Sequence, residues 1–533
     1  MAVAWQATIP GAPEGLQVLL DEARGPLLPP IRSEIFGPQR FAQHGRSLGE
    51  THRAVRATWR TASFFPRLRD NIRVLREAQR WIATQSAVGY DLSPAALWLM
   101  DNFNLIEAQL DEVRKGLPRS YFRALPVLSD APLAGLPRVY GIAWAFVAHT
   151  DGAFDDALLI HFLQAYQGSR ELTLGEMWAL PTTLRVVLVE NLRRLAERVA
   201  THKAARELAN RCCDQLATLT LPALDGLMAG LIRRGVATAF LAQLALRLAD
   251  HRLDAPVGSL AGLDAWLRQA LPDPASAQAQ QRADQTADNL SVSNAVNSLR
   301  AISDADWPDL VARSSTLMQQ MLTAPLFEAE AMSTRDQTLH GIERLARRSR
   351  RSEGEVARAL LALMAGDTGE TAAAAHWLQG AGRPVLAQAL GLREPLAALW
   401  RRARPRLVLP LYLAALAALT AAALAWVLPH PLAGLDAWAL LAGALVLWPA
   451  SEAAVAVTNR LVSESARPRH LSRLALADGV PAAHRVMVAV PAMLGSTASI
   501  DRLARRLLLH RLANPEDQAQ FILALAEKPF APN

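Results

Sequence analysis

The segment TTLRVVLVENLRRLAERVA, residues 182–200, decides the fold class. Its apolar residues recur at intervals of three and four, the spacing of one face of an α-helix. These apolar residues are Leu184, Val187, Leu188, Leu192, Leu195 and Val199. The charged residues fall mostly opposite them: Arg185, Glu190, Arg193, Arg194 and Glu197. The pattern predicts a helix with one packed face and one solvated face.

The same helical spacing recurs toward the N-terminus. Residues 156–167 and 70–81 carry apolar side chains at helical intervals, and Gly168 is placed to end the first of these helices as a left-handed cap. Alternating apolar and polar runs, which are typical of half-buried strands, are nearly absent before residue 480. We therefore expect a mainly α protein whose first 400 residues are all helical.

Composition limits the class of protein. The chain has 533 residues, of which 51% are hydrophobic and 20% charged, so it is not a disordered polyelectrolyte. Its net charge is +7, but the arginines are spread along helical patterns and no nucleic-acid motif is present, so we expect no nucleic-acid partner. The only cysteines, Cys212 and Cys213, are adjacent, which excludes a disulfide framework and indicates a reducing compartment.

A mean hydropathy of +0.11 is high for a chain with this many charges, and the surplus lies late in the sequence. Residues 407–428, LVLPLYLAALAALTAAALAWVL, carry no charge and as a helix would span about 33 Å, the thickness of a bilayer core. Residues 437–457 form a second apolar run that includes Pro449 and Glu452. We predict a transmembrane hairpin over 407–457. The alternative for either run is a buried helix of a soluble protein.

Basic residues flank this predicted hairpin on both sides. Four arginines lie within 401–406 and three more follow the second run, whereas the connection at 429–436 contains neither Lys nor Arg. The positive-inside rule then places both termini in the cytoplasm. The first residues, MAVAWQATIPGAPEG, lack the basic start and long apolar stretch of a secretory signal. The predicted topology is multi-pass.

The sequence after the hairpin changes character. Residues 486–494 form a short apolar run, a helix is predicted at 499–512, and residues 521–525 form a second apolar run. This order of strand, helix and strand is the opening of a βαβ unit, and two strands do not make a complete domain. Before the hairpin, a polar stretch rich in Ala, Gln and Asp at 273–289 predicts a linker, although an exposed helix is the alternative.

No complete catalytic motif is present, so we assign neither catalytic residues nor metal ligands. There is no P-loop, no dinucleotide-binding fingerprint, no HExxH and no GxSxG. The sharpest polar cluster contains His149, Asp151, Asp155 and Asp156, and could hold a metal or a sugar hydroxyl. The favoured interpretation is the start of a helix, where acids are stabilised by the helix dipole. Three tryptophans are interpreted as core rather than as sugar-stacking residues: Trp144, Trp178 and Trp377.

Several long segments resemble the N-terminal cytoplasmic region of bacterial cyclic β-1,2-glucan synthases. The resemblance runs in family order over about residues 30–525. Its segments are NFNLIEAQLDEVRKGLPRSYFRALP from Asn102, LAGLPRVYGIAWAFVAHTD from Leu133, LTLGEMWALPTTLRVVLVENLRRLAER from Leu172, VSNAVNSLRAISDADWPDL from Val292, STRDQTLHGIERLARRSRRSEGEVARAL from Ser333, HWLQGAGRP from His376 and DGVPAAHRVMVAVPAML from Asp478.

The resemblance implies an enzyme of the bacterial inner membrane that transfers glucose from UDP-glucose to β-1,2-glucan. The full-length family would use Mg²⁺ with that donor. It implies that residues 471–533 begin a GT-A-like glycosyltransferase domain, whose catalytic acids would lie further on. The family usually has an LTDF-like segment after the second strand, whereas this chain reads FILALAEKPFAPN from Phe521. We expect a truncated, inactive transferase. By analogy, Val490 and Pro491 would touch the nucleotide at the end of the first strand, the alternative being ordinary strand termination.

The predicted parts are a tail (1–29), a helical domain (30–272), a linker (273–289), a second helical part (290–400), the transmembrane hairpin (407–457) and the start of a transferase domain (471–533). Two functions follow from this organisation. The chain is the scaffold and membrane anchor of a cyclic β-1,2-glucan synthase, or a stand-alone membrane-anchored protein that binds β-1,2-glucan or assembles with a chain supplying catalytic domains.

Overall fold

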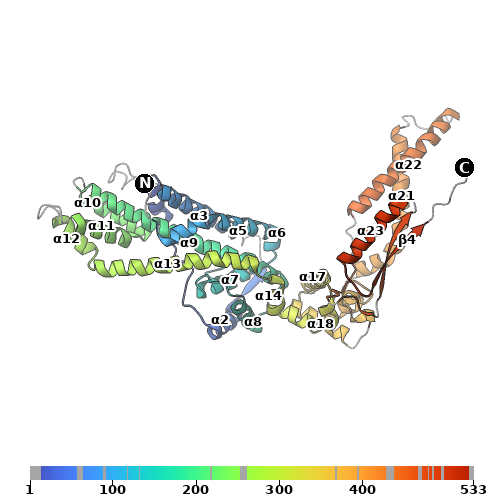
Figure 1. The fold of residues 1–533 in the computed structure, drawn as a ribbon, viewed down its shortest axis with the longest axis horizontal. Coiled ribbons are helices and arrows are strands. Elements are labelled where there is room, and N and C mark those ends of the chain that lie inside the picture. Colours follow the sequence, from blue (N-terminus) through green and yellow to red (C-terminus); the bar gives the residue numbers. More distant parts are fainter. Residues whose placement is uncertain are drawn as a thin grey trace. The chain divides into compact units, whose positions relative to one another are not determined.

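The computed structural model describes residues 14–56, 64–87, 92–116, 118–130, 132–216, 219–251, 261–365, 369–392, 395–427, 437–465, 471–477, 479–482, 485–493 and 497–526 (Figure 1). With 77% helix it is mainly α, as predicted. The chain divides into two compact units, Met1–Gln319 and Gln320–Asn533, which we call unit 1 and unit 2.

Unit 1 is helical apart from two short strands. In chain order its elements are α1 (Glu14–Leu20), the 3₁₀ turn η1 (Glu22–Arg24), α2 (Pro38–Thr51), β1 (Ala54–Arg56), α3 (Phe64–Ala87), α4 (Pro94–Asp101), α5 (Phe103–Gly116), α6 (Arg119–Phe122), β2 (Pro126–Leu128), α7 (Arg138–His149), α8 (Asp156–Ser169), α9 (Leu174–Asp214), α10 (Leu221–Arg234), α11 (Ala237–His251), α12 (Ala261–Ala270), α13 (Pro274–Asp304), α14 (Trp307–Ser314) and α15 (Thr316–Met321), whose end lies in unit 2. Strands β1 and β2 pair antiparallel.

Helix α9, of 41 residues, is the centre of unit 1. It begins with a capping box in which the Thr173 hydroxyl accepts from the Glu176 amide and the Glu176 carboxylate accepts from the Thr173 amide. Helices α3, α5, α7, α11 and α13 all pack against it. The predicted helix at 182–200 is therefore confirmed, but its solvated face is not, because the charged face lies under neighbouring helices.

Four of the five charged side chains on that face are buried. Glu190 is 1% exposed, while Arg193, Arg194 and Glu197 are each 8% exposed. Glu190 accepts hydrogen bonds from three elements: Arg67 Nε at 2.9 Å and Asn71 Nδ2 at 3.0 Å from α3, the Tyr140 hydroxyl at 2.8 Å from α7, and Arg194 Nη2 at 2.8 Å from α9 itself. Glu197 Oε1 similarly accepts a hydrogen bond from Arg234 Nη2 of α10 at 2.6 Å. The buried charges thus join α9 to its neighbours.

The flanking helices also match their predictions, with one correction. Helix α3 contains the predicted 70–81 and α8 the predicted 156–167. The prediction that Gly168 caps α8 is wrong: the helix continues through Ser169, and its C-cap is Arg170, in extended conformation with φ −152°. The Arg170 side chain donates to the carbonyl of Gly49 in α2, which positions this helix end.

The predicted linker at 273–289 is part of helix α13. Asp273 caps its N-terminus by accepting from the Ser276 amide at 3.0 Å, and Pro274 occupies the first turn. The polar stretch has few apolar residues to pack, and Arg198 of α9 instead holds it by ion pairs to Asp284 at 2.7 Å and Asp288 at 2.9 Å. The alternative of a helix is therefore correct, and the boundary between units falls at residues 319–320.

The expected N-terminal tail is folded over the part that the structure describes. Helix α1 buries Leu16, Leu19 and Leu20, and it packs against α9. The carbonyls of Leu19 and Gly25 accept from the buried guanidinium of Arg234. Residues 14–29 therefore belong to the core of unit 1, because their leucines and carbonyls complete the surroundings of α9 and α10.

Unit 2 begins with a small helical cluster. Its elements are α16 (Pro325–Ala329), α17 (Met332–Ser349), α18 (Glu353–Met364), the 3₁₀ turn η2 (Gly369–Ala372), α19 (Ala374–Leu378), α20 (Arg383–Ala389), α21 (Pro395–Val427), α22 (Ala437–Ser465), β3 (Val486–Met493), α23 (Thr497–Ala513) and β4 (Ala519–Ala526). Helices α17 to α20 pack together around Ile342, Val356, Leu360 and Leu386, which are fully buried.

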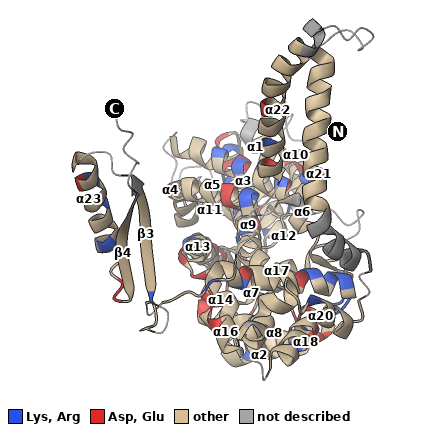
Figure 2. Cartoon of the chain, turned by 90° about the vertical axis from the view of Figure 1, so that its right-hand side faces the viewer, with Lys and Arg blue, Asp and Glu red and all other residues tan. Residues whose placement is uncertain are grey.

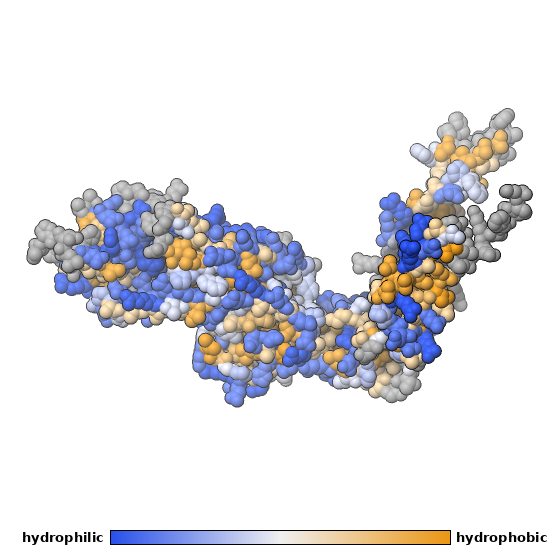
Figure 3. Space-filling model, viewed as in Figure 1, coloured by the Kyte–Doolittle hydropathy of each residue, from blue (hydrophilic) through white to orange (hydrophobic). Residues whose placement is uncertain are grey.

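Helices α21 and α22 pack side by side, and the Tyr412 hydroxyl donates to Asn459 Oδ1 at 2.9 Å between them. Among the described residues one helical segment is long and apolar enough to cross a membrane, Leu407–Val427, with a mean hydropathy of 2.2 and none of it buried. It carries no charged side chain (Figure 2), and apolar residues lie exposed on both helices (Figure 3). The second span remains a prediction, and the connection at 429–436 lies outside the described residues.

The strand, helix and strand predicted after the hairpin are present. Strands β3 and β4 pair in parallel from Val486 with Ala519 to Met493 with Ala526, and α23 connects them. No residue of α23 is buried. The preceding segment returns to the helical cluster: the Ala331 amide donates to the Arg473 carbonyl and the Ala475 amide to the Ala329 carbonyl, both at 2.8 Å. These bonds flank Glu330, whose pKa is raised by burial to about 7.

Replacing Glu190 with Gln should destabilise the protein strongly. Burial opposes ionisation of Glu190, yet Arg67, Arg194 and the Tyr140 hydroxyl lower its pKa to about 2. The variant would leave the Arg67 and Arg194 charges uncompensated, at a cost of about 3 kcal/mol of unfolding free energy. The carboxylate's contribution is complete above its unfolded pKa, about 4.5, and decreases as the pH falls toward 2.

The measurement is thermal or denaturant unfolding of the full chain in detergent. The matched control is Glu112→Gln, because Glu112 pairs with Lys115 at the surface and should contribute less than about 0.5 kcal/mol. Equal stabilities of the two variants at neutral pH would contradict the central role of Glu190.

Candidate functional site

Val490 and Pro491, the residues predicted to touch a nucleotide, lie within β3 and not at its end. The strand continues to Met493, and the two residues pair with Leu523 and Ala524 of β4. Val490 is half-buried and Pro491 exposed. Both strand partners are apolar, and nucleotide contact at this strand stays a prediction.

The polar cluster around His149 spans the turn between α7 and α8. His149 ends α7, whereas Asp155 and Asp156 form the start of α8, as favoured from the sequence. Asp155 caps α8 by accepting from the Leu158 amide at 2.8 Å, and Asp151 accepts from the Ser291 hydroxyl at 2.6 Å. The His149 ring stacks on Phe36 with ring centroids 3.8 Å apart. Throughout the described ranges, no three His, Cys, Asp or Glu side chains are grouped as metal ligands would be.

The two cysteines and Trp144 pack within unit 1 and do not form a reactive or ligand-binding site in the part of the chain that the structure describes. Cys212 and Cys213 are buried in α9, and burial raises the pKa of their thiols to about 12 and about 11, so both stay protonated. Trp144 receives the Arg194 guanidinium over its ring, 4.9 Å from the centroid. These residues are occupied by contacts within unit 1.

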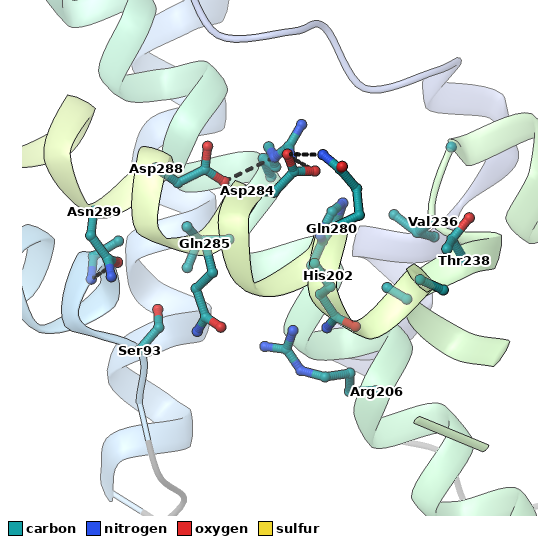
Figure 4. A pocket seen from close by; sticks show the side chains of 17 residues that line it. Ser93, His202, Arg206, Val236, Thr238, Gln280, Asp284, Gln285, Asp288 and Asn289 are labelled. Carbon is teal, nitrogen blue, oxygen red and sulfur yellow. Dashed lines mark hydrogen bonds and ion pairs between the residues drawn. The ribbon is translucent and has the colours of Figure 1, made fainter. Parts of the chain in front are cut away.

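A polar cavity in unit 1 is the strongest candidate for a binding site (Figure 4). Its volume is about 250 Å³, and it is formed by the start of α4, the middle of α9, the connection between α10 and α11, and the first half of α13. Its polar lining consists of Ser93, Arg198, His202, Arg206, Thr238, Gln280, Gln281, Asp284, Gln285, Asp288 and Asn289. A cavity of this size and polarity accommodates several water molecules or a small polar ligand.

On one side of the cavity the carboxylates are paired with arginines. Arg198 binds both Asp284 and Asp288, Arg32 Nη1 contacts Asp288 at 3.1 Å, and Gln280 Nε2 donates to Asp284 at 3.0 Å. Asn289 accepts from the Ala95 amide at 2.8 Å and so fixes the start of α4. These contacts hold α13 against α9 and neutralise the carboxylates.

The other side contains His202 and Arg206, one turn apart on α9. Neither has a hydrogen bond or ion pair with any residue that the structure describes. Burial, together with Arg198 and Arg206, lowers the pKa of His202 to about 4, so its ring is neutral at pH 7 and offers one donor and one acceptor. Burial also lowers the pKa of Arg206, which nevertheless remains a cation. Among the described residues that line the cavity, Arg206 is therefore a positive charge without a paired carboxylate.

The sequence contains one feature that indicates this site, a row of basic residues on α9. Arg198, His202 and Arg206 are spaced by four on a helix that is otherwise packed, which places three basic side chains in one row. The row could have been recognised, but the cavity could not, because it also requires α4, α11 and α13.

No protein-family model matches this chain. Among curated proteins, cyclic β-(1,2)-glucan synthase NdvB of Rhizobium meliloti (strain 1021) is 30% identical over 545 aligned residues, which cover 97% of this chain. The resemblance to cyclic β-1,2-glucan synthases is confirmed. The chain spans 18% of the length of NdvB, and the expected similarity to an N-terminal region fits that coverage.

Replacing His202 with Gln should reduce the loss of stability at mildly acidic pH. The folded pKa of His202 is below its unfolded value of 6.5, so the folded state binds fewer protons and loses stability as the pH falls from 6.5 toward 4. We expect the wild type to lose about 1–2 kcal/mol more than His202→Gln between pH 7 and pH 5.

Unfolding curves at the two pH values measure this difference. His161→Gln is the control, because His161 is exposed on α8 outside the cavity. An identical pH dependence for wild type and His202→Gln would show that His202 is protonated normally.

Proposed function

We propose that this chain is the helical scaffold and membrane anchor of a cyclic β-1,2-glucan synthase and that it does not transfer glucose by itself. The observation that carries the proposal is the similarity to NdvB over 97% of the chain. In this proposal the full synthase uses UDP-glucose and Mg²⁺, and β3, α23 and β4 contribute to a GT-A-like domain.

The acids of the α/β segment support inactivity of this chain alone. Open α/β sheets bind ligands beyond the carboxyl ends of their strands. Glu516 and Asp517 precede β4, and Glu516 already accepts from the Val480 amide at 3.0 Å. Among the described acids after residue 471, Asp501 is the one that lies near the start of α23, the helix that follows the carboxyl end of β3. Glucosyl transfer requires a general base as well as stabilisation of the departing diphosphate, which one carboxylate does not supply.

The surface of α21 and α22 supports the anchoring role. Leu409, Leu411 and Leu413 of α21 and Leu445 and Trp448 of α22 are each at least half exposed. Apolar surface of this extent is unfavourable in water and suits the hydrocarbon core of a bilayer. We propose that both helices span an inner membrane with cytoplasmic flanks.

Membranes containing only this chain should form no β-1,2-glucan from radiolabelled UDP-glucose and Mg²⁺. Product is measured by size fractionation and linkage analysis, with membranes from cells carrying the empty vector as background. Membranes that contain an intact cyclic β-1,2-glucan synthase serve as the positive control. Glucan formation by this chain above the background would overturn the claim of inactivity.

The topology predicts which introduced cysteines react with a membrane-impermeant maleimide. Ala433→Cys, in the connection between the two spans, should be labelled in intact cells lacking an outer-membrane barrier, whereas Ala513→Cys, exposed on α23, should be labelled only after permeabilisation. The native Cys212 and Cys213 give little background because they are buried and protonated. Labelling of Ala513→Cys in intact cells would contradict the proposed orientation.

The alternative function is a stand-alone membrane-anchored protein that binds β-1,2-glucan or an assembly partner. The polar cavity of unit 1 favours it, since amides, hydroxyls and paired charges are the groups that recognise polyhydroxylated ligands. Co-purification with a separately encoded chain that supplies glucosyl transfer would favour this alternative over the scaffold of a single synthase.

A further inference from the structure

We propose that the cavity between α9 and α13 is a binding site for a small hydroxylated anion of the sugar phosphate class, with Arg206 as its charge-recognising residue. The site lies entirely in unit 1 and is independent of glucosyl transfer by the α/β segment.

The first step of the inference is the uncompensated guanidinium. Arg206 is half-buried, and an arginine partly withdrawn from water is stabilised by a carboxylate partner, as the neighbouring Arg198 is by two. Arg206 borders the same cavity, four and eight residues further than His202 and Arg198, and has no partner among the described residues. A bound anion would supply the missing negative charge.

The second step is that the cavity's own acids cannot turn toward Arg206 without breaking contacts. Asp288 is held by Arg198 and Arg32 from opposite oxygens, and Asp284 is held by Arg198 and Gln280. The charge of both carboxylates is therefore already matched. A carboxylate released to pair with Arg206 would leave Arg198 or Arg32 unpaired instead.

The third step is the arrangement of neutral polar groups around Arg206. Figure 4 shows the Arg206 guanidinium and the Gln285 amide extending into the same space, with His202 beside them. A neutral imidazole and an amide donate hydrogen bonds to an anion and also accept them from hydroxyl groups. The pocket wall formed by Ala95, Val199, Val236 and Ala239 offers apolar contact for the carbon face of a sugar ring.

The size of the cavity limits the ligand. A volume of about 250 Å³ is just below the usual range for small-molecule sites, which suits a single sugar with one phosphoryl group rather than an oligosaccharide. The planar guanidinium favours a phosphoryl or carboxylate group, to which it donates two parallel hydrogen bonds. Inorganic phosphate contains the charge alone and glucose the hydroxyl groups alone, so the two halves of the proposed ligand can be tested separately.

The experiment is calorimetric titration of the full detergent-solubilised chain with glucose 6-phosphate, inorganic phosphate and glucose. We expect glucose 6-phosphate to bind most tightly, phosphate more weakly and glucose most weakly. Arg206→Gln should weaken glucose 6-phosphate binding by roughly 10- to 100-fold, the range for a charge-assisted hydrogen bond. Gln285→Glu, which places a negative charge beside Arg206, should weaken it by a similar factor.

The matched control is Arg211→Gln, because Arg211 lies on the same helix outside the cavity and pairs with Glu207. It should bind glucose 6-phosphate as the wild type does. Without ligand, Arg206→Gln should unfold at the same or a higher temperature than the wild type, since it removes a half-buried charge that has no carboxylate partner among the described residues. This measurement also shows that the variant folds.

Any one of three results would overturn the proposal of this binding site. Absence of binding by glucose 6-phosphate and phosphate up to millimolar concentration would reject an anion site. Equal affinity of wild type and Arg206→Gln would reject Arg206 as the recognising residue. Glucose binding as tightly as glucose 6-phosphate would reject an anionic ligand. Glucan formation in the separate membrane assay would overturn the proposed inactivity of the chain and would leave each of these binding outcomes unaffected.

Discussion

The pairing of buried charges along α9 is the constraint on which unit 1 depends. A charged side chain loses its hydration when neighbouring helices cover it, and it is tolerated only if its partners replace the water. Glu190 meets this condition through α3 and α7, and Glu197 through α10. Because each acid needs donors from different helices, the helices have a fixed rotation and register around α9. Apolar packing alone would allow several arrangements of comparable burial.

The same constraint explains how the polar stretch of α13 is positioned. Its first half has little apolar surface, but Asp284 and Asp288 lie one turn apart and both reach Arg198. Further along, Val292, Leu299 and Ile302 are fully buried and continue the contact with ordinary packing. One helix is thus attached by ion pairs at one end and by apolar side chains at the other. The cavity occurs where the attachment is polar, since long paired side chains fill space less completely than a close-packed apolar core.

The local structure was predictable wherever the apolar spacing is regular. Residues 182–200, 156–167 and 70–81 are helical, and the apolar runs of β3 and β4 form strands. Burial was predicted less well. Charged residues such as Glu190 and Arg194 are typical of a solvated helix face, but Glu190 is buried by hydrogen-bond partners that lie more than 40 residues away in the sequence. The prediction of a linker at 273–289 was wrong for a related reason. The residue that holds this part of α13 in place, Arg198, lies on another helix. His202 and Arg206 were visible as a spaced pair, but their lack of partners is a property of the assembled unit.

The hydrogen bonds around Glu330 have a consequence for the order of biosynthesis. The segment that carries Arg473 and Ala475 is translated only after both α21 and α22, yet its backbone pairs with residues 329–331, which are translated before them. The pairing closes a loop of more than a hundred residues around the two helices. Its formation therefore has to wait until the ribosome has passed both helices. Until then, Glu330 and the neighbouring amides remain hydrated, and closure of the loop marks the point at which the two apolar helices have been synthesised as a pair.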